Sequence, residues 1–203
     1  MSIKEEYEAL NGQRRKGRDD IYQEVHIDDS VIDEVDIKGA IDVFKNNHSS
    51  IIYFGAAWCP WCRLALPVLI EYAKRNDERI SYCDLNHKRP AYKIIDDKIT
   101  LVDSGDVDYP LLIDNFKEIM EECVVYDGDK VIKIEGTYNI DLPLTVFGSF
   151  GTVKGYHYGA VDLKCDQTPY DLLDKDQIDE LLMIFKEKEK TRAMTCSLDG
   201  KCE

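Results

Sequence analysis

Between Ile51 and Arg63 the sequence reads IIYFGAAWCPWCR, an apolar run followed by two cysteines. Four apolar residues in succession, 51–54, are typical of a strand buried on both faces, and the small residues after them allow a sharp exit into a helix. Cys59 is therefore expected at a helix N-terminus, where the helix dipole stabilises a thiolate and lowers its pKa. Cys62, three residues later, lies on the same helical face and can attack a disulfide formed at Cys59.

A C-x-x-C pair also occurs as half of a structural zinc site. Such a site needs two further Cys or His ligands, usually in a second paired spacing, and the chain offers only the distant Cys196 and Cys202. The four histidines share no ligand spacing. Because the strand–turn–helix context is that of a redox motif, we predict that Cys59 and Cys62 are catalytic residues of a thiol–disulfide site that uses neither a metal ion nor a cofactor.

Three segments carry a resemblance to a known family. Residues 51–72, with Trp58 before the cysteine pair and Pro67 five residues after the second cysteine, resemble the thioredoxin superfamily. The C-P-W-C-R turn is most similar to that of thioredoxin-like proteins known as bacteriocin transport accessory proteins. Further along the chain, residues 140–147 resemble the cis-proline loop of the superfamily, and residues 158–160 resemble the end of its last strand.

This resemblance implies an α/β, thioredoxin-like fold, in which a central mixed β-sheet is flanked by helices and an insertion lies between the second strand and the cis-proline loop. We expect an N-terminal extension at residues 1–35, a thioredoxin-like domain at 36–192 with the insertion at about 88–136, and a Cys-containing tail at 193–203. The insertion either shapes a substrate groove or caps a sheet edge.

Periodicity and turn signals predict further elements of the chain. The expected helices lie at about 36–47, at 109–120 and from 174 onward, and the expected strands lie at 20–27, 79–85, 124–126, 131–134, 144–147 and 153–158.

The resemblance also implies a substrate-binding surface around the cysteines. Trp58 and Trp61 would supply flat apolar surface beside the exposed sulfur, with Pro60 between the cysteines. The backbone next to the Leu142–Pro143 bond, expected to be cis, would pair with an extended substrate as an added strand. The expected partners are a protein or peptide disulfide and an unidentified dithiol electron donor.

A proton acceptor for the second cysteine is less obvious. Thioredoxins carry a buried Asp in the strand before the motif, where this chain has Tyr53, and usually a Lys in the neighbouring strand, where this chain has Asp84. Asp84 falls within a strand that should be half buried, and burial raises a carboxyl pKa toward the operating pH. Asp84 is either a relocated proton acceptor or a hydrated residue at the strand end, and the sequence leaves both open.

Composition limits the partners. At 203 residues the chain is longer than one minimal thioredoxin domain and short for two domains, and its 44% apolar content can bury a core. A net charge of −14 argues against nucleic acid or an anionic membrane surface as the main partner, because both need a basic face. The basic run at 11–18 is interpreted as a solvated linker rather than a partner site.

The first residues, 1–7, carry charges where a signal peptide needs an apolar core, and no stretch approaches the ~18 apolar residues of a membrane span. Seven cysteines without a secretory signal suit a reducing compartment. Cys196 and Cys202 are either free thiols on the tail, which we prefer, or a tail disulfide that exchanges with Cys59 and Cys62. We therefore expect a cytoplasmic protein with no membrane partner.

The predicted function is that of a thiol–disulfide oxidoreductase that reduces or exchanges protein disulfides through the Cys59-Pro-Trp-Cys62 pair. The alternative is an accessory or binding module with the same fold, which holds a specific partner with little turnover. Catalysed reduction of insulin by dithiothreitol distinguishes the two functions.

Overall fold

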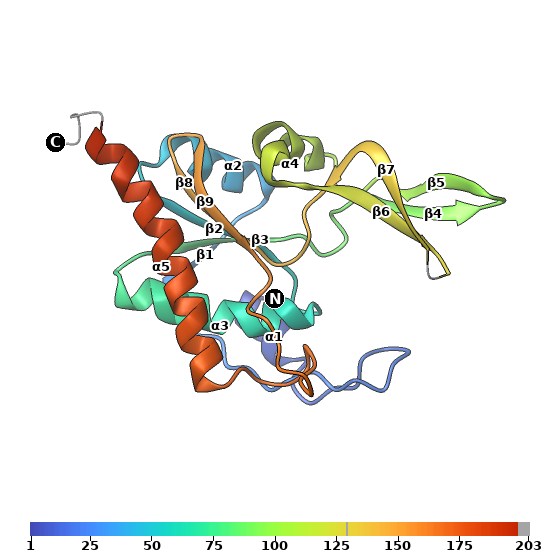
Figure 1. Ribbon diagram of the computed structural model, residues 1–203, viewed down its shortest axis with the longest axis horizontal. Coiled ribbons are helices and arrows are strands. Elements are labelled where there is room, and N and C mark those ends of the chain that lie inside the picture. The colour runs from blue at the N-terminus through green and yellow to red at the C-terminus, as the bar shows by residue number, and fades with distance from the viewer. Residues whose placement is uncertain (129, 199–203) are drawn as a thin grey trace.

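A five-stranded central sheet organises the computed structural model, which describes residues 1–128 and 130–198, with side chains as far as Lys190 (Figure 1). The order across the sheet is β1-β3-β2-β8-β9. Strands β1, β3 and β2 run parallel, whereas β8 is antiparallel to β2 and β9 is antiparallel to β8. The strands are β1 (Ile32–Glu34), β2 (Ser50–Gly55), β3 (Ile80–Asp84), β8 (Leu144–Ser149) and β9 (Thr152–Tyr158).

Helices cover both faces of this sheet. One face packs against α1 (Ile3–Glu8), α3 (Pro60–Arg75) and α5 (Lys175–Leu198), and the other packs against α2 (Ile37–Asn46) and α4 (Tyr109–Phe116). The fold is therefore α/β and thioredoxin-like, with a central mixed sheet flanked by helices, as predicted.

Strand β2 sends alternate side chains into two separate cores. Ile51 and Tyr53 pack among residues of α3 and α5, whereas Ile52 and Phe54 pack among residues of α2 and α4. All six residues of β2 are buried. This two-sided burial is the physical reason for the continuous apolar run in the sequence, and it confirms the predicted strand.

Two helix starts follow the sequence signals. The Asp36 carboxylate accepts the Gly39 N–H at 2.7 Å and caps α2. At the start of α5, the Asp174 carboxylate accepts the Gln177 N–H, and the Gln177 side chain accepts the Asp174 N–H, both at 3.1 Å. The predicted helices at 36–47 and from 174 onward are confirmed.

The N-terminal residues pack into the same body as the sheet. Ile3 and Tyr7 are fully buried in the core beneath α3, and β1, which follows a short 3₁₀ turn (Asp29–Val31), pairs with β3. The strand predicted at 20–27 is wrong, because among these residues only Ile21 forms a bridge, to Arg14. Side-chain hydrogen bonds hold this segment in place of strand pairing, as described below.

The segment 88–136 contains α4, one complete β-hairpin and most of a second. Strand β4 (Ala91–Ile95) pairs with β5 (Lys98–Asp103), and β6 (Glu121–Asp127) pairs with β7 (Lys130–Asn139). Within the described residues each hairpin forms a sheet of its own, and Figure 1 shows both extending away from the central sheet. The hairpin around the Asp-Gly turn was predicted, and the β4–β5 hairpin was not. A 3₁₀ turn (Lys117–Ile119) continues α4.

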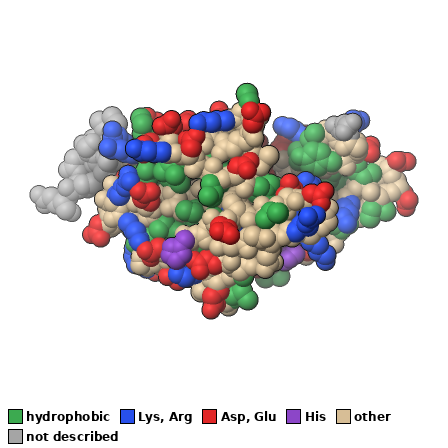
Figure 2. Space-filling model, turned by 90° about the horizontal axis from the view of Figure 1, so that it is seen from below, with side chains coloured by type: hydrophobic (Ala, Val, Ile, Leu, Met, Phe, Trp, Pro, Cys, Tyr) green, Lys and Arg blue, Asp and Glu red, His purple; other side chains and the backbone are tan. Residues whose placement is uncertain are grey.

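At the C-terminal end, α5 extends to Leu198, so it includes the first residues of the predicted tail. The side chain of Cys196 and all of Cys202 lie outside the part of the chain that the structure describes. None of the helices described here has the length and hydropathy that crossing a membrane requires. Seen from below, Lys and Arg side chains are scattered among acidic ones (Figure 2).

Candidate active site

The cysteine pair lies at the N-terminus of α3. Cys59 is the N-cap residue, and its Sγ accepts the backbone N–H of Cys62 at 3.4 Å. Pro60 occupies the first helical position. The N–H that proline lacks would have no partner within the helix there, and the fixed φ of proline suits the helix. The N-cap sulfur therefore faces the positive end of the helix dipole.

The two sulfurs have opposite electrostatic environments. The pKa of Cys59 is lowered, first by a hydrogen bond from the Cys62 thiol, then by the backbone N–H groups of Cys62 and Trp61 and by the charge of Arg89, against the opposing effect of burial. Burial raises the pKa of Cys62, and the neighbouring Cys59 thiolate raises it further. Cys59 is 5% exposed and Cys62 is 0% exposed. The arrangement fits an outer nucleophile and an inner resolving thiol.

Tyrosines occupy the space beneath Cys62. The Tyr53 hydroxyl donates to the Cys62 carbonyl oxygen at 3.1 Å, and it lowers the pKa of the Cys62 thiol, although burial outweighs this effect. The Tyr53 ring stacks on Tyr82 with centroids 5.9 Å apart, and Tyr7 meets Tyr82 edge-on at 6.3 Å. The position next to Cys62 therefore holds a phenol hydroxyl in place of a carboxylate.

Asp84 lies at the end of β3, half buried, opposite Gly55 of β2. Burial raises its pKa, and its carboxylate accepts the Asn86 N–H at 3.0 Å. Among the described hydrogen bonds, none joins Asp84 to Cys59 or Cys62. Its assignment as a proton acceptor stays a prediction.

The loop before β8 lies across the outer sulfur. The Leu142–Pro143 peptide bond is cis, and the Cys59 thiol donates to the Leu142 carbonyl oxygen at 3.5 Å. Pro143 itself is buried. Leu142 is half buried, and its backbone lies beside Cys59.

A cavity of about 660 Å³ opens over Cys59. Four of the five residues predicted to bind substrate line it, namely Trp58, Pro60, Trp61 and Leu142. Its other walls come from distant segments and consist of Arg15, Arg18, Asp20, Arg89, Asp141, Thr168, Pro169 and Tyr170.

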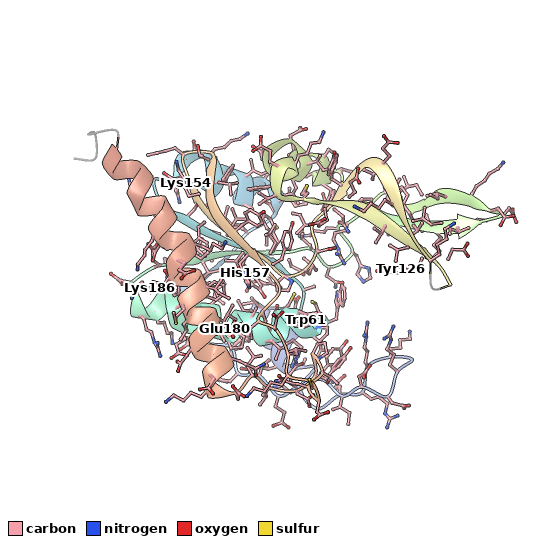
Figure 3. All side chains as sticks on the ribbon, in the orientation of Figure 1. Trp61, Tyr126, Lys154, His157, Glu180 and Lys186 are labelled. Carbon is pink, nitrogen blue, oxygen red and sulfur yellow. The ribbon has the colours of Figure 1, made fainter. Side chains whose placement is uncertain are left out.

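The two tryptophans differ in their surroundings. The Trp58 indole N–H donates to the Asn86 side-chain oxygen at 2.8 Å, and the Arg89 guanidinium carbon lies 6.0 Å from the ring centroid. Trp61 faces α5 and, with His157 and Glu180, lines a neighbouring cavity of about 510 Å³; these three side chains are labelled in Figure 3. His157 is half buried, and burial lowers its pKa.

Arg63, the residue after the motif, is completely buried, and no sequence pattern indicated its role. Its guanidinium donates to the Tyr7 carbonyl at 2.8 Å, to the Gln23 carbonyl at 2.6 Å and to the Asn11 side chain at 2.5 Å. It also donates to the Gln23 side chain at 3.2 Å. These bonds fasten the N-terminal segment to α3 directly behind the cysteine pair.

Other site residues that the sequence did not reveal lie in loops, including Arg15, Gln23, Asn86 and Arg89. They belong to no spaced motif, and tertiary folding alone brings them to Cys59. Within the described residues, no group of three or more His, Cys, Asp and Glu side chains is arranged to hold a metal ion.

The pKa difference predicts a selective chemical modification. We expect iodoacetamide to alkylate Cys59 before Cys62 and Cys83, with a rate that rises through a midpoint below the pKa of about 8.5 of a free cysteine. Cys62 and Cys83 are fully buried, and burial raises the pKa of Cys83 to about 12. Peptide mapping after brief labelling between pH 5 and 9 measures each rate. Since Cys165 is exposed, a Cys165→Ser variant removes one competing label. Labelling of Cys62 or Cys83 ahead of Cys59 would contradict the assigned roles.

No family model and no curated protein matches the chain. Among solved structures it is similar to mitochondrial thioredoxin 3 from Saccharomyces cerevisiae in its oxidized form, at 19% identity over 63% of this chain and 83% of that one, with a TM-score of 0.35. It is also similar to thioredoxin O2 from Arabidopsis thaliana in its oxidized state, at 17% identity over 66% of this chain and 85% of that one, with a TM-score of 0.37. The fold assignment rests on the strand order and helix layers rather than on these alignments.

Proposed function

We propose that the protein is a thiol–disulfide oxidoreductase that acts on protein or peptide disulfides. The observation that carries the proposal is the cysteine pair itself. Cys59 has a lowered pKa at a helix N-terminus and lies 3.5 Å from the Leu142 carbonyl oxygen, whereas Cys62 is buried one turn into the helix. This is the arrangement that two-step thiol–disulfide exchange requires.

The reaction follows from the two environments. The Cys59 thiolate attacks one sulfur of the substrate disulfide, the other substrate sulfur leaves as a thiolate that takes up a proton, and a mixed disulfide forms. Cys62 then gives up its proton and attacks the Cys59 sulfur. The Cys59–Cys62 disulfide forms and the second substrate thiol departs. The substrate gains two electrons and two protons, and a dithiol donor returns the pair to its reduced state.

In this reaction Trp58, Pro60, Trp61 and Leu142 would contact the substrate, because they line the cavity over Cys59. Pro143 would act from behind by holding the Leu142 backbone in place. Asp84 is proposed as the group that receives the Cys62 proton through water, since burial raises its pKa.

The test is turnover. Reduction of insulin by dithiothreitol should proceed well above background in the presence of the protein. A titratable Cys59–Cys62 pair without turnover would support the accessory function instead.

We also propose a reducing, cytoplasmic setting, on the basis of the free cysteines, and a kinship with bacteriocin transport accessory proteins, on the basis of the C-P-W-C-R turn. The division into 1–35, 36–192 and 193–203 is likewise a proposal.

The potential of the pair is predicted from the same geometry. Stabilising the Cys59 thiolate stabilises the reduced protein, which makes the disulfide more oxidising. Pro60 has no N–H to offer the sulfur, so the stabilisation comes from Cys62, Trp61 and Arg89. We expect a value between the roughly −270 mV of thioredoxin and the roughly −200 mV of glutaredoxins. Equilibration with glutathione buffers measures it, and a value below that of thioredoxin would contradict the prediction.

A further inference from the structure

Three arginines surround the nucleophile. Arg15 and Arg18 come from the N-terminal loop and Arg89 comes from the loop after β3, and all three line the cavity over Cys59. The chain as a whole has 40 acidic and 26 basic residues. The basic run at 11–18, interpreted from the sequence as a solvated linker, therefore contributes two cations to the wall of the candidate active site.

These cations lack carboxylate partners. Within the described part of the chain, Arg15 donates to the Tyr170 hydroxyl at 2.6 Å and Arg89 to the Ile140 carbonyl at 3.1 Å, and none of the three arginines of the cavity forms a salt bridge. The adjacent Arg14 is different, because it pairs with Asp19 at 2.6 Å. Arginine donors beside the nucleophile are therefore available to a ligand.

Two aspartates, Asp20 and Asp141, line the same cavity. Three guanidinium groups against two carboxylates leave a local balance of one positive charge, in a chain whose net charge is −14. Because of this contrast, negatively charged groups of a substrate are attracted to the site more strongly than to the rest of the surface.

The site is longer than a small disulfide needs. Leu142 also lines two neighbouring cavities of about 510 and 540 Å³, and the second of these is walled by β4 and β6 of the segment 88–136. Trp58 and Arg89 line a further cavity of about 460 Å³. Shared lining residues place these hollows next to the cavity over Cys59, which suits an extended chain. The second hollow is lined by Glu121, Glu122 and Asp141 against Lys133, so acidic side chains of a substrate would lie in the cavity of the three arginines rather than there.

We propose that the substrate of this site is a disulfide within an acidic stretch of polypeptide, whose carboxylates lie against Arg15, Arg18 and Arg89. The proposal rests on the proposed function and specifies its substrate class. Charge complementarity of this kind raises the association rate, and salt weakens it.

The test uses matched disulfide-bonded peptides that differ only in the residues flanking the cysteine, which are Glu, Gln or Lys. The prereduced protein is mixed with each peptide in a stopped-flow instrument, and the second-order rate constant is measured. We expect the Glu peptide to react at least about 10-fold faster than the Lys peptide at low ionic strength, with the Gln peptide between them. The ratio should fall toward one in 1 M salt.

Two variants assign the preference to the cavity. Arg18→Gln removes an exposed charge whose side chain makes no described hydrogen bond, and Arg15→Gln/Arg18→Gln removes two charges. Each should lower the ratio of Glu to Lys peptide rates. Arg14→Gln is the matched control, because Arg14 does not line the cavity, and its ratio should equal that of the unmodified protein.

The outcomes separate the two proposals. Reaction with all three peptides at equal rates would overturn the acidic substrate and leave the oxidoreductase intact, whereas failure to react with any of them would overturn the oxidoreductase. Glutathione disulfide carries carboxylates without a polypeptide chain. If it reacts as fast as the Glu peptide, the polypeptide part of the proposal is wrong.

Discussion

Replacing Cys59 with serine is expected to lower the rate of disulfide reduction on the order of 10³-fold or more, because the variant has no thiolate to attack the substrate. A serine hydroxyl at the same N-cap can satisfy the helix N–H groups, so the fold should persist. The insulin assay measures the loss, and a denaturation curve confirms that the variant is folded.

The companion variant Cys62→Ser tests the division of roles. Its Cys59 remains nucleophilic but the mixed disulfide cannot be resolved, so substrate should stay covalently bound to Cys59 and be recovered on non-reducing gels. Cys165→Ser is the matched control, since Cys165 is exposed and lines no cavity at the site. Substantial turnover by Cys59→Ser, or trapping at a different cysteine, would show that the nucleophile is misassigned.

Replacing Arg63 with methionine should destabilise the protein by about 3–5 kcal/mol, a large share of the 5–15 kcal/mol of a typical domain. Methionine fills much of the volume but donates nothing to the carbonyl or the side-chain oxygen of Gln23, which have no other described donor. Each buried acceptor left without a donor costs about 1–3 kcal/mol. The Tyr7 carbonyl and the Asn11 side chain lose less, because the N–H groups of Leu10 and Val25 still donate to them. Urea denaturation measures the change. Hydrogen exchange should show faster opening of residues 7–23.

The control is Arg75→Met, at the other end of the same helix. Arg75 is exposed and pairs with Glu71 one turn earlier, so its replacement should change the unfolding free energy by no more than about 0.5 kcal/mol. Arg63→Lys keeps the charge with fewer donors and should fall between. An Arg63→Met variant within about 1 kcal/mol of the unmodified protein would mean that the buried bonds contribute little.

Local patterns were sufficient to predict the centre of the fold. The run at 51–54 is buried on both faces and therefore apolar throughout, and the N-cap cysteine directly after it follows from the strand–turn–helix order. For this reason the sequence could predict that the two cysteines lie at the start of α3 and that Trp58, Pro60 and Trp61 lie beside them. The apolar run and the cysteine pair are local patterns, and each is specific for one structure.

The rest of the site could not be predicted because it depends on contacts between distant segments. In the sequence Arg63 cannot be distinguished from a surface arginine, because its burial depends on contacts with the distant N-terminal segment. Residues 11–18 have the composition of a linker, and only the folded structure shows that Arg15 and Arg18 line the cavity. The residues at 20–27 have strand-like composition, but side-chain bonds such as those to Gln23 hold them instead. Single-sequence periodicity contains no information about such pairings.

The neighbouring position of β2 and β8 has a consequence for chain entropy. Ser50 pairs with Gly148, so this contact closes a loop that contains α3, β3 and the whole segment 88–136. The entropic cost of closure grows only logarithmically, by about 0.6 kcal/mol for each doubling of loop length. The two hairpins and α4 also form from local contacts, which shortens the flexible part of the loop. The segment 88–136 therefore joins β3 to β8 at a small entropic cost. It can change in length without altering the strand register around Cys59.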